Sequence, residues 1–393
     1  MRPLSLVTCV LLAGCALQAP PTSTAASGGA TSVQTASATS AEPGPTTATD
    51  PVSACLAMAE GLSQKARAGQ LVMVGVSGTL DAAERKAITA NKAGSVILMG
   101  GTGGGVKGVA KLTASLRKLG GETGMLVSAD QEGGLVQRLK GAGFATIPSA
   151  ANQARLSNAA LTKAARGWGT SLAKAGVRLD LAPVADVVPA ANARTNQPIA
   201  RLGRGYGSNP AKVSAKVTAF RDGLKAAGVE SAVKHFPGLG AVKGNTDFTA
   251  RVVDSTTTAT STRLQPFHDA VAARTGAVMV SSATYTRIDA KNIAMFSPKV
   301  IAILRGWGYE GVVISDDLGA AAALKNVPAQ QRAYRLVAAG GDIALTVAPS
   351  VASRLTAGLV SHAKSDPEFS RTMTAAVARV LQLKENLGLI HCG

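Results

Sequence analysis

Residues 211–235 read AKVSAKVTAFRDGLKAAGVESAVKH, and they contain the repeating unit on which the fold prediction rests. Apolar residues recur at helical spacing over Ala211–Ala227, and Gly228 is a typical residue at a helix end. Glu230–His235 then forms a short run with strand character. A helix, a glycine and a buried strand in this order are typical of proteins in which helices and strands alternate.

The same alternation continues on both sides of this unit. Apolar runs with strand character lie at Leu71–Val76, Ser95–Met99, Met125–Ala129, Arg178–Pro183, Glu230–His235, Ala277–Ser281, Val312–Ser315 and Asp342–Val347. Helical patterns cover Asp81–Ala93, Lys107–Leu119, Asn152–Ala175, Ala211–Ala227, Arg263–Arg274, Pro298–Trp307 and Ala320–Ala338. Eight such strands predict an α/β fold, a TIM-type (β/α)8 barrel. The alternative is an open doubly wound sheet, because a strand count from sequence is easily wrong by one. No break in composition divides residues 51–393, so we predict a single domain there.

The N-terminus has the features of an export signal. Arg2 supplies a positive charge, and the apolar run from Leu4 to Leu12 is shorter than the about 20 residues needed to span a bilayer. Leu12-Ala13-Gly14-Cys15 follows and resembles a bacterial lipoprotein signal, in which the cysteine becomes the lipidated first residue. We predict a signal peptide at 1–14, lipidation of Cys15 and an exported protein that is lipid-anchored to the cell membrane in the cell envelope, or secreted. The alternative is an ordinary secretory peptide with an incidental cysteine.

The segment behind the signal has the composition of a tether. Residues 16–50 are mainly Ala, Ser, Thr, Pro and Gly with almost no large apolar residue. Such a segment buries too little surface to offset its ordering entropy, so we predict a lipid-anchored disordered linker at 15–50. Of the four cysteines, Cys9 leaves with the signal and Cys15 carries lipid. Because an exported protein meets an oxidising environment and a closed barrel brings its first and last elements together, we predict a Cys55–Cys392 disulfide.

The charge balance excludes some partners and favours others. The chain of 393 residues has 41 Lys and Arg against 23 Asp and Glu, which gives a net charge of +18. This charge suits a surface that meets anionic polymers or lipid headgroups. Aromatic residues make up only 3%, the basic residues are scattered and no nucleic-acid motif is present, so we expect no nucleic-acid partner. The four histidines are widely spaced, so we predict no metal site and no cofactor, and we expect a monomer.

Polar side chains collect where the predicted strands end. Ser128–Glu132 follows the third strand, Asp186 lies beyond the fourth, Lys234-His235 closes the fifth, and Ser315-Asp316-Asp317 closes the seventh. In a barrel of this kind the active-site residues lie at the carboxyl ends of the strands. Any one of these acids also has a simpler interpretation as the cap of the following helix. Several of them on one face favour a catalytic or binding site.

Six segments resemble glycoside hydrolase family 3, in particular its single-domain bacterial β-N-acetylhexosaminidase branch. These segments are GQLVMVGV at 69–76, ADQEGGLVQRL at 129–139, RLDLAPVADV at 178–187, RGYGSNP at 204–210, KHFPGLG at 234–240 and GVVISDDL at 311–318. They occur in the family's order and span nearly all of the predicted barrel. The combination of KHFPG with a later SDDL is highly specific.

The resemblance implies a retaining mechanism and a set of roles. Asp316 matches the nucleophile, which attacks the anomeric carbon to form a glycosyl-enzyme, and Asp317 is interpreted as a cap of the next helix. Asp130 matches the residue that binds hydroxyls of the terminal sugar. Other positions that match the sugar pocket are Arg138, Arg204, Lys234 and His235. An alternative interpretation of Arg138 and Arg204, compatible with binding, is an ion pair with Asp130 or Glu132 that organises the loops.

One loop departs from the family pattern. After KHFPGHG the branch carries an Asp-Ser-His element, whose histidine is the general acid/base. An alignment without gaps puts Asn245 at the family's Asp and Asp247 at its catalytic His, and Leu239 replaces another His. Three hypotheses remain open. Asp247 serves as acid/base with a raised pKa, or the loop rearranges and another group or water protonates the leaving group, or the protein binds sugar without catalysis.

The function that the sequence favours is that of an exo-acting β-N-acetylglucosaminidase. It would remove terminal β-GlcNAc from peptidoglycan-derived fragments, with membrane contact through the lipid anchor. Within enzymes the alternative is a β-glucosidase-like hydrolase, although such family members usually carry a second sandwich domain. From another class the alternative is a non-catalytic or weakly active cell-wall sugar-binding lipoprotein, suggested by the missing loop histidine.

Overall fold

Eight parallel strands form a closed ring in the computed structural model, which describes residues 51–100 and 103–393. The barrel strands are β1 (Val72–Val76), β2 (Ser95–Leu98), β3 (Leu126–Ala129), β6 (Leu179–Asp180), β7 (Glu230–Phe236), β9 (Ala277–Val280), β11 (Val312–Ser315) and β12 (Ala344–Thr346). Each strand pairs in parallel with the next one along the chain. All eight correspond to runs that the sequence predicts.

The ring closes between its last two strands. Ile314 of β11 and Ile343, just before β12, form a parallel bridge, and the Ser315 amide donates to the Ile343 carbonyl at 2.9 Å. This closure excludes the open doubly wound sheet and confirms the TIM-type barrel. Most strand residues are buried on both faces, which explains why they appear in the sequence as continuous apolar runs rather than alternating ones.

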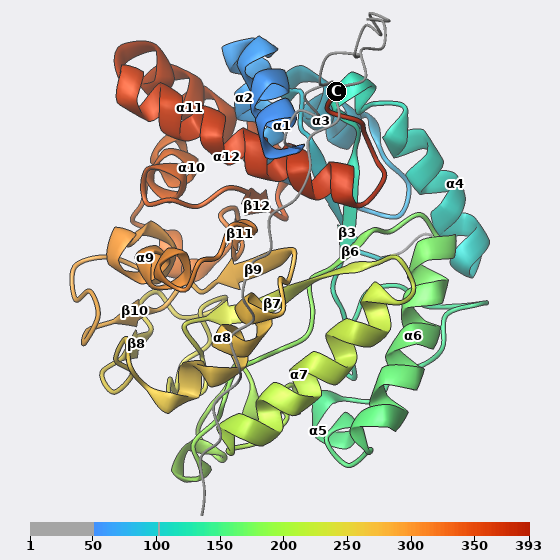
Figure 1. The fold of residues 1–393 in the computed structure, drawn as a ribbon, viewed down its shortest axis with the longest axis vertical. Helices are drawn as coiled ribbons and strands as arrows, with labels where there is room; N and C mark the ends of the chain where they lie inside the picture. Colours follow the sequence, from blue (N-terminus) through green and yellow to red (C-terminus); the bar gives the residue numbers. More distant parts are fainter. Residues whose placement is uncertain (1–50, 101–102) are drawn as a thin grey trace, which may run out of the picture. The chain divides into compact units, whose positions relative to one another are not determined.

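Helices surround the strands (Figure 1). They are α1 (Pro51–Gly61), α2 (Gln64–Gln70), α3 (Ala82–Asn91), α4 (Gly105–Arg117), α5 (Ala150–Gln153), α6 (Asn158–Lys174), α7 (Pro210–Lys225), α8 (Gln265–Ala272), α9 (Pro298–Gly306), α10 (Ala329–Ala338), α11 (Ala352–Ser365) and α12 (Pro367–Asn386). Short extra strands lie outside the barrel as the antiparallel pair β4 (Gln131–Gly133) with β5 (Val136–Gln137) and the parallel pair β8 (Val253–Asp254) with β10 (Thr284–Tyr285).

Two predicted helices are wrong in extent. The pattern over Asn152–Ala175 is interrupted, because Ser157 caps a new helix by accepting from the Ala160 amide. The pattern over Ala320–Ala338 becomes α-helical only at Ala329, directly after Pro328, and a single 3-10 turn at Ala322–Leu324 precedes it. Proline has no N–H to donate inside a helix, so the chain before it is free to form a long loop. That loop lies at the carboxyl end of β11 and takes part in the candidate active site.

Helix α12 covers the amino-terminal face of the barrel. Its buried Lys384 donates to the side chain of Gln70, just before β1, at 2.6 Å. It also donates to the carbonyls of Thr123 and Gly124, just before β3. Burial lowers the pKa of Lys384 to about 7. Arg379 of the same helix pairs at 2.8 Å with the buried Asp342, just before β12. These contacts hold α12 across the ends of several strands, so this face of the barrel is closed.

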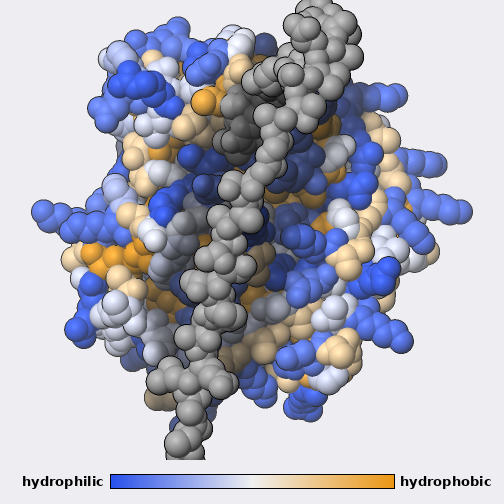
Figure 2. All heavy atoms as spheres, in the orientation of Figure 1, coloured by the Kyte–Doolittle hydropathy of each residue, from blue (hydrophilic) through white to orange (hydrophobic). Residues whose placement is uncertain are grey.

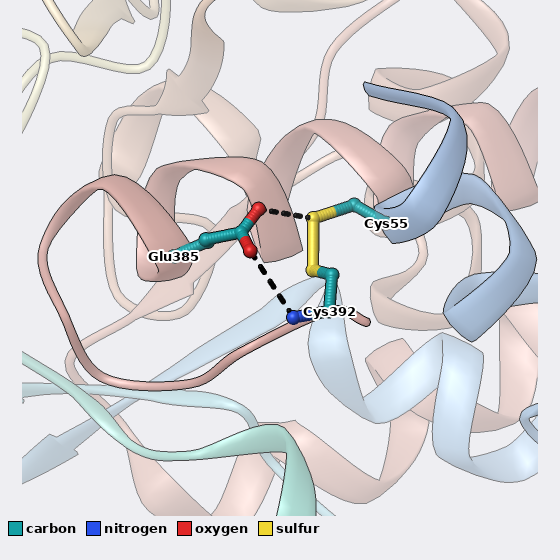
Figure 3. Close-up of side chains that lie close together, drawn as sticks. All are labelled: Cys55, Glu385 and Cys392. Carbon is teal, nitrogen blue, oxygen red and sulfur yellow. Dashed lines mark hydrogen bonds between the residues drawn. A yellow bond between two sulfur atoms is a disulfide. The ribbon is translucent and has the colours of Figure 1, made fainter. Parts of the chain in front are cut away.

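A disulfide joins the two ends of the described domain. Cys55 on α1 is bonded to Cys392 near the C-terminus, and α1 lies beside α12 (Figure 1). The Glu385 carboxylate lies next to the bond and accepts from the Cys392 amide at 3.2 Å (Figure 3). Because both sulfurs are in the disulfide, this Cys–Glu–Cys cluster offers no thiolate to a metal ion. The pair is the one that the sequence predicts.

Loss of the disulfide is expected to destabilise the barrel without changing its site. A Cys392→Ser variant removes the link between α1 and the C-terminus, and a disulfide that closes a long loop typically contributes about 2–4 kcal/mol. We expect a lower midpoint in chemical denaturation for the variant, and the same lowering for the unaltered protein in reductant. If reductant lowers the midpoint of Cys392→Ser as well, or leaves that of the unaltered protein unchanged, the stabilising role is wrong.

The predicted signal peptide at 1–14, the lipidated Cys15 and the linker at 15–50 lie outside the described residues. Within residues 51–100 and 103–393, no helix is both long and apolar enough to cross a membrane. On the face in Figure 2, hydrophilic side chains project from most of the surface and apolar residues form scattered patches. Only Arg2, Glu42 and Asp50 are charged among the first 50 residues, so the excess of basic residues belongs to the barrel domain.

Candidate active site

A cavity of about 510 Å³ lies at the carboxyl ends of the barrel strands. Its inner wall is apolar and includes Ile97, Met279 and Leu345, which are contributed by β2, β9 and β12. Seven charged or titratable residues that the sequence predicts for the site all line it. These are Asp130, Arg138, Arg204, Lys234, His235, Asp247 and Asp316. The structure therefore brings together side chains from five separate segments of the chain.

Asp316 follows directly on β11. Its amide donates to the Val280 carbonyl of β9 at 3.0 Å, which extends the strand pairing to this residue and fixes its backbone. One carboxylate oxygen accepts from the Asp317 amide at 2.8 Å, and the other accepts from the Ser282 hydroxyl at 3.4 Å. The carboxylate thus sits on a strand end, held by two neutral donors, and faces the same cavity as Asp130 and Lys234.

Asp317 does not cap a helix, and the predicted cap is wrong. Its carboxylate accepts from the amides of Gly319 and Ala320 and from the amide of Val347 after β12, at 2.7–2.9 Å. The segment that follows is a loop, and α10 begins only at Ala329. Asp317 therefore organises the loop beside Asp316 and links it to the neighbouring strand.

A cluster of alternating charges forms one wall of the cavity. Lys234 Nζ lies 2.6 Å from Asp130 Oδ1 and 2.7 Å from Glu132 Oε1, and the buried Glu132 binds Arg204 through both of its oxygens. Burial alone raises the pKa of a carboxyl group. The charges of Arg204 and Lys234 outweigh this effect and hold the pKa of Glu132 well below its usual range. Glu132 therefore stays ionised and positions both cations.

The ion-pair interpretation applies to one of the two arginines. Arg204 is paired with Glu132 and also lines the cavity, so an organising role and a binding role coexist. For Arg138 no carboxylate lies at ion-pair distance among the residues that the structure describes. Its backbone amide donates to the Asp130 carbonyl at 3.1 Å, and its side chain lines the cavity. Arg138 is thus available to a ligand.

A second buried acid lies next to this cluster. Asp180 on β6 accepts from the Gln131 amide at 3.0 Å, while its other oxygen has no hydrogen-bond partner among the described residues. Burial raises the pKa of Asp180 to about 8, so the group is largely protonated at neutral pH. A neutral Asp180 adds no negative charge to the cluster, so Lys234 forms its ion pairs with Asp130 and Glu132.

His235 is held in one orientation by Asp186. Its Nδ1 donates to Asp186 Oδ2 at 2.8 Å, and the same carboxylate accepts from the amide of Leu239 at 2.7 Å. Arg204 Nη2 approaches His235 Nε2 at 3.4 Å, which is consistent with an acceptor at that nitrogen. A carboxylate behind Nδ1 sets the tautomer of the imidazole. Asp186, which the sequence places beyond the fourth strand, thus acts through His235 and the following loop.

The loop that carries Asp247 is braced from two sides. Buried Asn196 donates to the carbonyls of Leu239 and Val242 at 2.7 and 2.8 Å. On the other side, the amide of Ala322 in the loop after β11 donates to the Asp247 carbonyl at 3.1 Å. Gly240 is required where this loop crosses the one after β6, since a Cβ there would clash with the Val187 carbonyl. The position of Asp247 is therefore fixed by contacts of its loop with the loop after β6 and with the loop after β11.

The carboxyl group of Asp247 lies at the mouth of the cavity. Partial removal from water, followed by repulsion from Asp316, raises the pKa of Asp247 to about 6, with His235 and then Arg204 opposing the shift. The Asp247 side chain is still accessible to solvent. The surrounding protein atoms therefore remove only part of its hydration shell. Asp247 and Asp316 thus present carboxyl groups to the cavity from two different environments. An acid that titrates near neutral pH is suited to proton transfer in both directions.

Several residues of the site carry no sequence signal of their own. Asn196 is one of many polar residues in a long loop, and nothing local distinguishes it from Asn192 in the same loop. Glu132 belongs to the polar run after the third strand, but its position behind Arg204 and Lys234 depends on three separate segments. Ser281-Ser282 ends the sixth strand, so the sequence places Ser282 near the strand ends, but its hydrogen bond to Asp316 is evident only in the structure.

Comparison with known proteins identifies similar chains. The glycosyl hydrolase family 3 N-terminal domain matches residues 63–383. Beta-hexosaminidase LpqI of Mycobacterium tuberculosis is 32% identical over 314 residues, which cover 76% of this chain and 78% of that protein. The crystal structure of a β-N-acetylhexosaminidase from Beutenbergia cavernae is 40% identical, with a TM-score of 0.81 over 82% of this chain and 99% of that one. A family 3 β-N-acetylglucosaminidase from Paenibacillus is 29% identical, with a TM-score of 0.77 over 84% of this chain and 63% of that one.

Proposed function

The chain belongs to glycoside hydrolase family 3, and from this premise we propose that it is a retaining exo-β-N-acetylhexosaminidase that removes terminal β-GlcNAc. The observation that carries the proposal is the position of Asp316. Its carboxylate follows the seventh barrel strand and faces the cavity that also contains Asp130 and Lys234. A nucleophile and a charged sugar-binding wall on one cavity are what a retaining glycosidase needs.

In the first step Asp316 attacks the anomeric carbon of the terminal sugar. A bond forms between its carboxylate oxygen and this carbon, while the bond from the carbon to the glycosidic oxygen breaks. Asp247 gives its proton to the departing oxygen, so the aglycone leaves as a neutral alcohol. The raised pKa of Asp247 supports this role, because a usual aspartic acid is almost fully ionised at pH 6.

In the second step water releases the sugar. Asp247, now ionised, takes a proton from a water molecule, and the water oxygen attacks the anomeric carbon. The bond to Asp316 breaks and its carboxylate is regenerated. Two inversions at one carbon leave the product with the β configuration of the substrate. Proton, nucleophile and leaving group are all accounted for without a cofactor.

The charged wall positions the sugar for this reaction. Asp130 accepts hydrogen bonds from hydroxyl groups, and Lys234, Arg204 and Arg138 donate to them. Glu132 lies behind this ring and fixes Arg204 and Lys234, while Asp186 fixes His235 beside it. A rigid ring of donors and acceptors reduces the entropy lost on binding and places the anomeric carbon next to Asp316.

We further propose that the natural substrates are peptidoglycan-derived fragments and that the protein is lipid-anchored in the cell envelope through Cys15. The described chain starts at α1, which packs against α12 on the amino-terminal face of the barrel, opposite to the cavity. The chain therefore enters the barrel domain on the face opposite to the active site. The basic barrel domain suits an environment of anionic polymers.

A substrate comparison with the full protein tests the proposed activity. We expect hydrolysis of an aryl β-GlcNAc and of a GlcNAc–MurNAc disaccharide, with kcat/KM at least about 100-fold above that for the matching β-glucoside. A preference for the β-glucoside would favour a glucosidase. Binding of GlcNAc without turnover of any substrate would favour the non-catalytic sugar-binding lipoprotein, which the altered loop sequence keeps as the second candidate.

A further inference from the structure

Four large apolar side chains are exposed on the described part of the chain, and two of them stand out. Phe248 and Leu135 are 83% and 76% exposed, whereas Leu56 and Val253 are only 38% and 36% exposed. Single exposed apolar residues are normal on protein surfaces. Phe248 and Leu135, however, both line the active-site cavity and come from different segments of the chain.

Phe248 directly follows Asp247 in the loop after β7. Its amide donates to the Asn245 carbonyl at 3.1 Å, and the same asparagine accepts from the Asp247 amide through its side chain at 3.0 Å. The two residues therefore share one tight turn. Braces from Asn196 and Ala322 hold the loop, so the phenyl ring is presented at a defined place beside the proposed acid.

Leu135 is contributed to the cavity by another segment of the chain. It lies between β4 and β5, the antiparallel pair that follows β3 and the charged wall. Neighbouring residues Gly133 and Gly134 have positive φ values of 102° and 57°, which a non-glycine residue adopts only with strain. The hairpin is thus shaped to place Leu135 at the rim, although an exposed leucine does not stabilise the barrel.

We propose that Phe248 and Leu135 form the subsite for the leaving-group sugar, with Phe248 as its stacking platform. This inference rests on the proposed function. Asp247 must reach the glycosidic oxygen, and that oxygen belongs to the leaving sugar, so the next residue in the loop lies close to this sugar. A pyranose ring presents an apolar face of C–H groups, which an exposed aromatic ring covers with little conformational entropy cost.

The chemistry of the two subsites is therefore different. Charged side chains surround the terminal sugar inside the cavity, which suits recognition of its hydroxyl pattern. Apolar side chains meet the second sugar at the rim, which suits recognition of a ring face without selection for particular substituents. The predicted ligand of the outer site is a second pyranose in a β-linked glycan, and extended substrates gain affinity over monosaccharides there.

A comparison of two substrates tests this subsite. We expect Phe248→Ala to lower kcat/KM for a disaccharide of two β-linked GlcNAc units about five- to tenfold more than kcat/KM for GlcNAc β-fluoride, which has no leaving sugar. Phe248→Trp, which keeps an aromatic ring, should retain the ratio of the two kcat/KM values that the unaltered protein has. The matched control is Leu56→Ala, an exposed apolar residue of α1, which should leave both rates as they are. Because Phe248 is so exposed, the substitution is not expected to affect folding.

Equal losses on both substrates would overturn the proposal, because Phe248 would then act on Asp247 rather than on the second sugar. No loss on either substrate would overturn it as well. Binding separates this inference from the proposed function. The affinity for a non-hydrolysable thio-linked disaccharide, relative to that for GlcNAc, should fall in Phe248→Ala whether or not the protein turns over. If the full-length protein binds the two equally, the subsite is absent.

Discussion

Replacement of Asp316 by alanine is expected to reduce kcat for an aryl β-GlcNAc by at least about 1,000-fold, with little change in stability. Without the carboxylate no glycosyl-enzyme forms, and the oxocarbenium-like transition state loses its nearest negative charge. The backbone at this position is held by the Val280 carbonyl, so the fold does not depend on the side chain. Steady-state kinetics on purified variant and thermal denaturation measure the two effects.

A matched control separates chemistry from charge. Asp222→Ala removes an exposed acid of α7 that pairs with Arg221 outside the cavity, and it should retain full activity. Asp130→Ala, by contrast, should raise KM, since it removes an acceptor for sugar hydroxyls. If Asp316→Ala keeps kcat within tenfold of the unaltered protein, Asp316 is not the nucleophile, however well its position suits that role.

Replacement of Asp247 by asparagine is expected to produce a loss that depends on the leaving group. A positioned general acid contributes about 100- to 10,000-fold when the leaving group is a poor one. We therefore expect a loss in this range in kcat/KM for a disaccharide, and a much smaller loss in kcat/KM for GlcNAc β-fluoride, whose departure needs little protonation. Both values report the first step, whereas the second step is the same for the two substrates. The ratio of the two losses in kcat/KM measures how much Asp247 accelerates the departure of the leaving sugar by protonating it.

The pH dependence of Asp247→Asn gives a second test. The acid must be protonated for the first step, and its raised pKa lies at about 6. In the unaltered protein kcat/KM should therefore fall about tenfold per pH unit above pH 6, and this fall should vanish in the variant. Asp247→His, which restores the family's residue type, should shift the pH at which kcat/KM begins to fall rather than abolish the fall. If kcat/KM of Asp247→Asn falls above pH 6 as in the unaltered protein, another group protonates the leaving sugar.

The barrel is predictable because its physical causes are local and repeated. A strand such as Val312–Ser315 is buried on both faces, so it appears as an apolar run whichever way the sheet curves. The convergence of Asp130, Lys234 and Asp316 follows from the barrel itself, because the carboxyl ends of parallel strands meet at one face. Residues far apart in the chain are thereby placed in one cavity by topology alone.

Other features depend on contacts that no local pattern reveals. Helix α12 is amphipathic like the other helices, and only its packing across the strand ends distinguishes it from a barrel helix. The late start of α10 depends on Pro328 and on a loop whose backbone is used by Thr246 and Asp247. Likewise, the order Arg204–Glu132–Lys234 arises from three segments, and their mutual distances decide which acid stays ionised.

Covalent trapping of the intermediate tests the central claim most directly. A GlcNAc analogue with fluorine on the ring and a fluoride leaving group slows hydrolysis of the glycosyl-enzyme, and mass spectrometry of a digest then locates the attached sugar. A label on the peptide that contains Asp316, absent in Asp316→Ala, is the predicted result. A label on another residue, or steady turnover of the natural substrate with no label at all, would contradict the proposed mechanism.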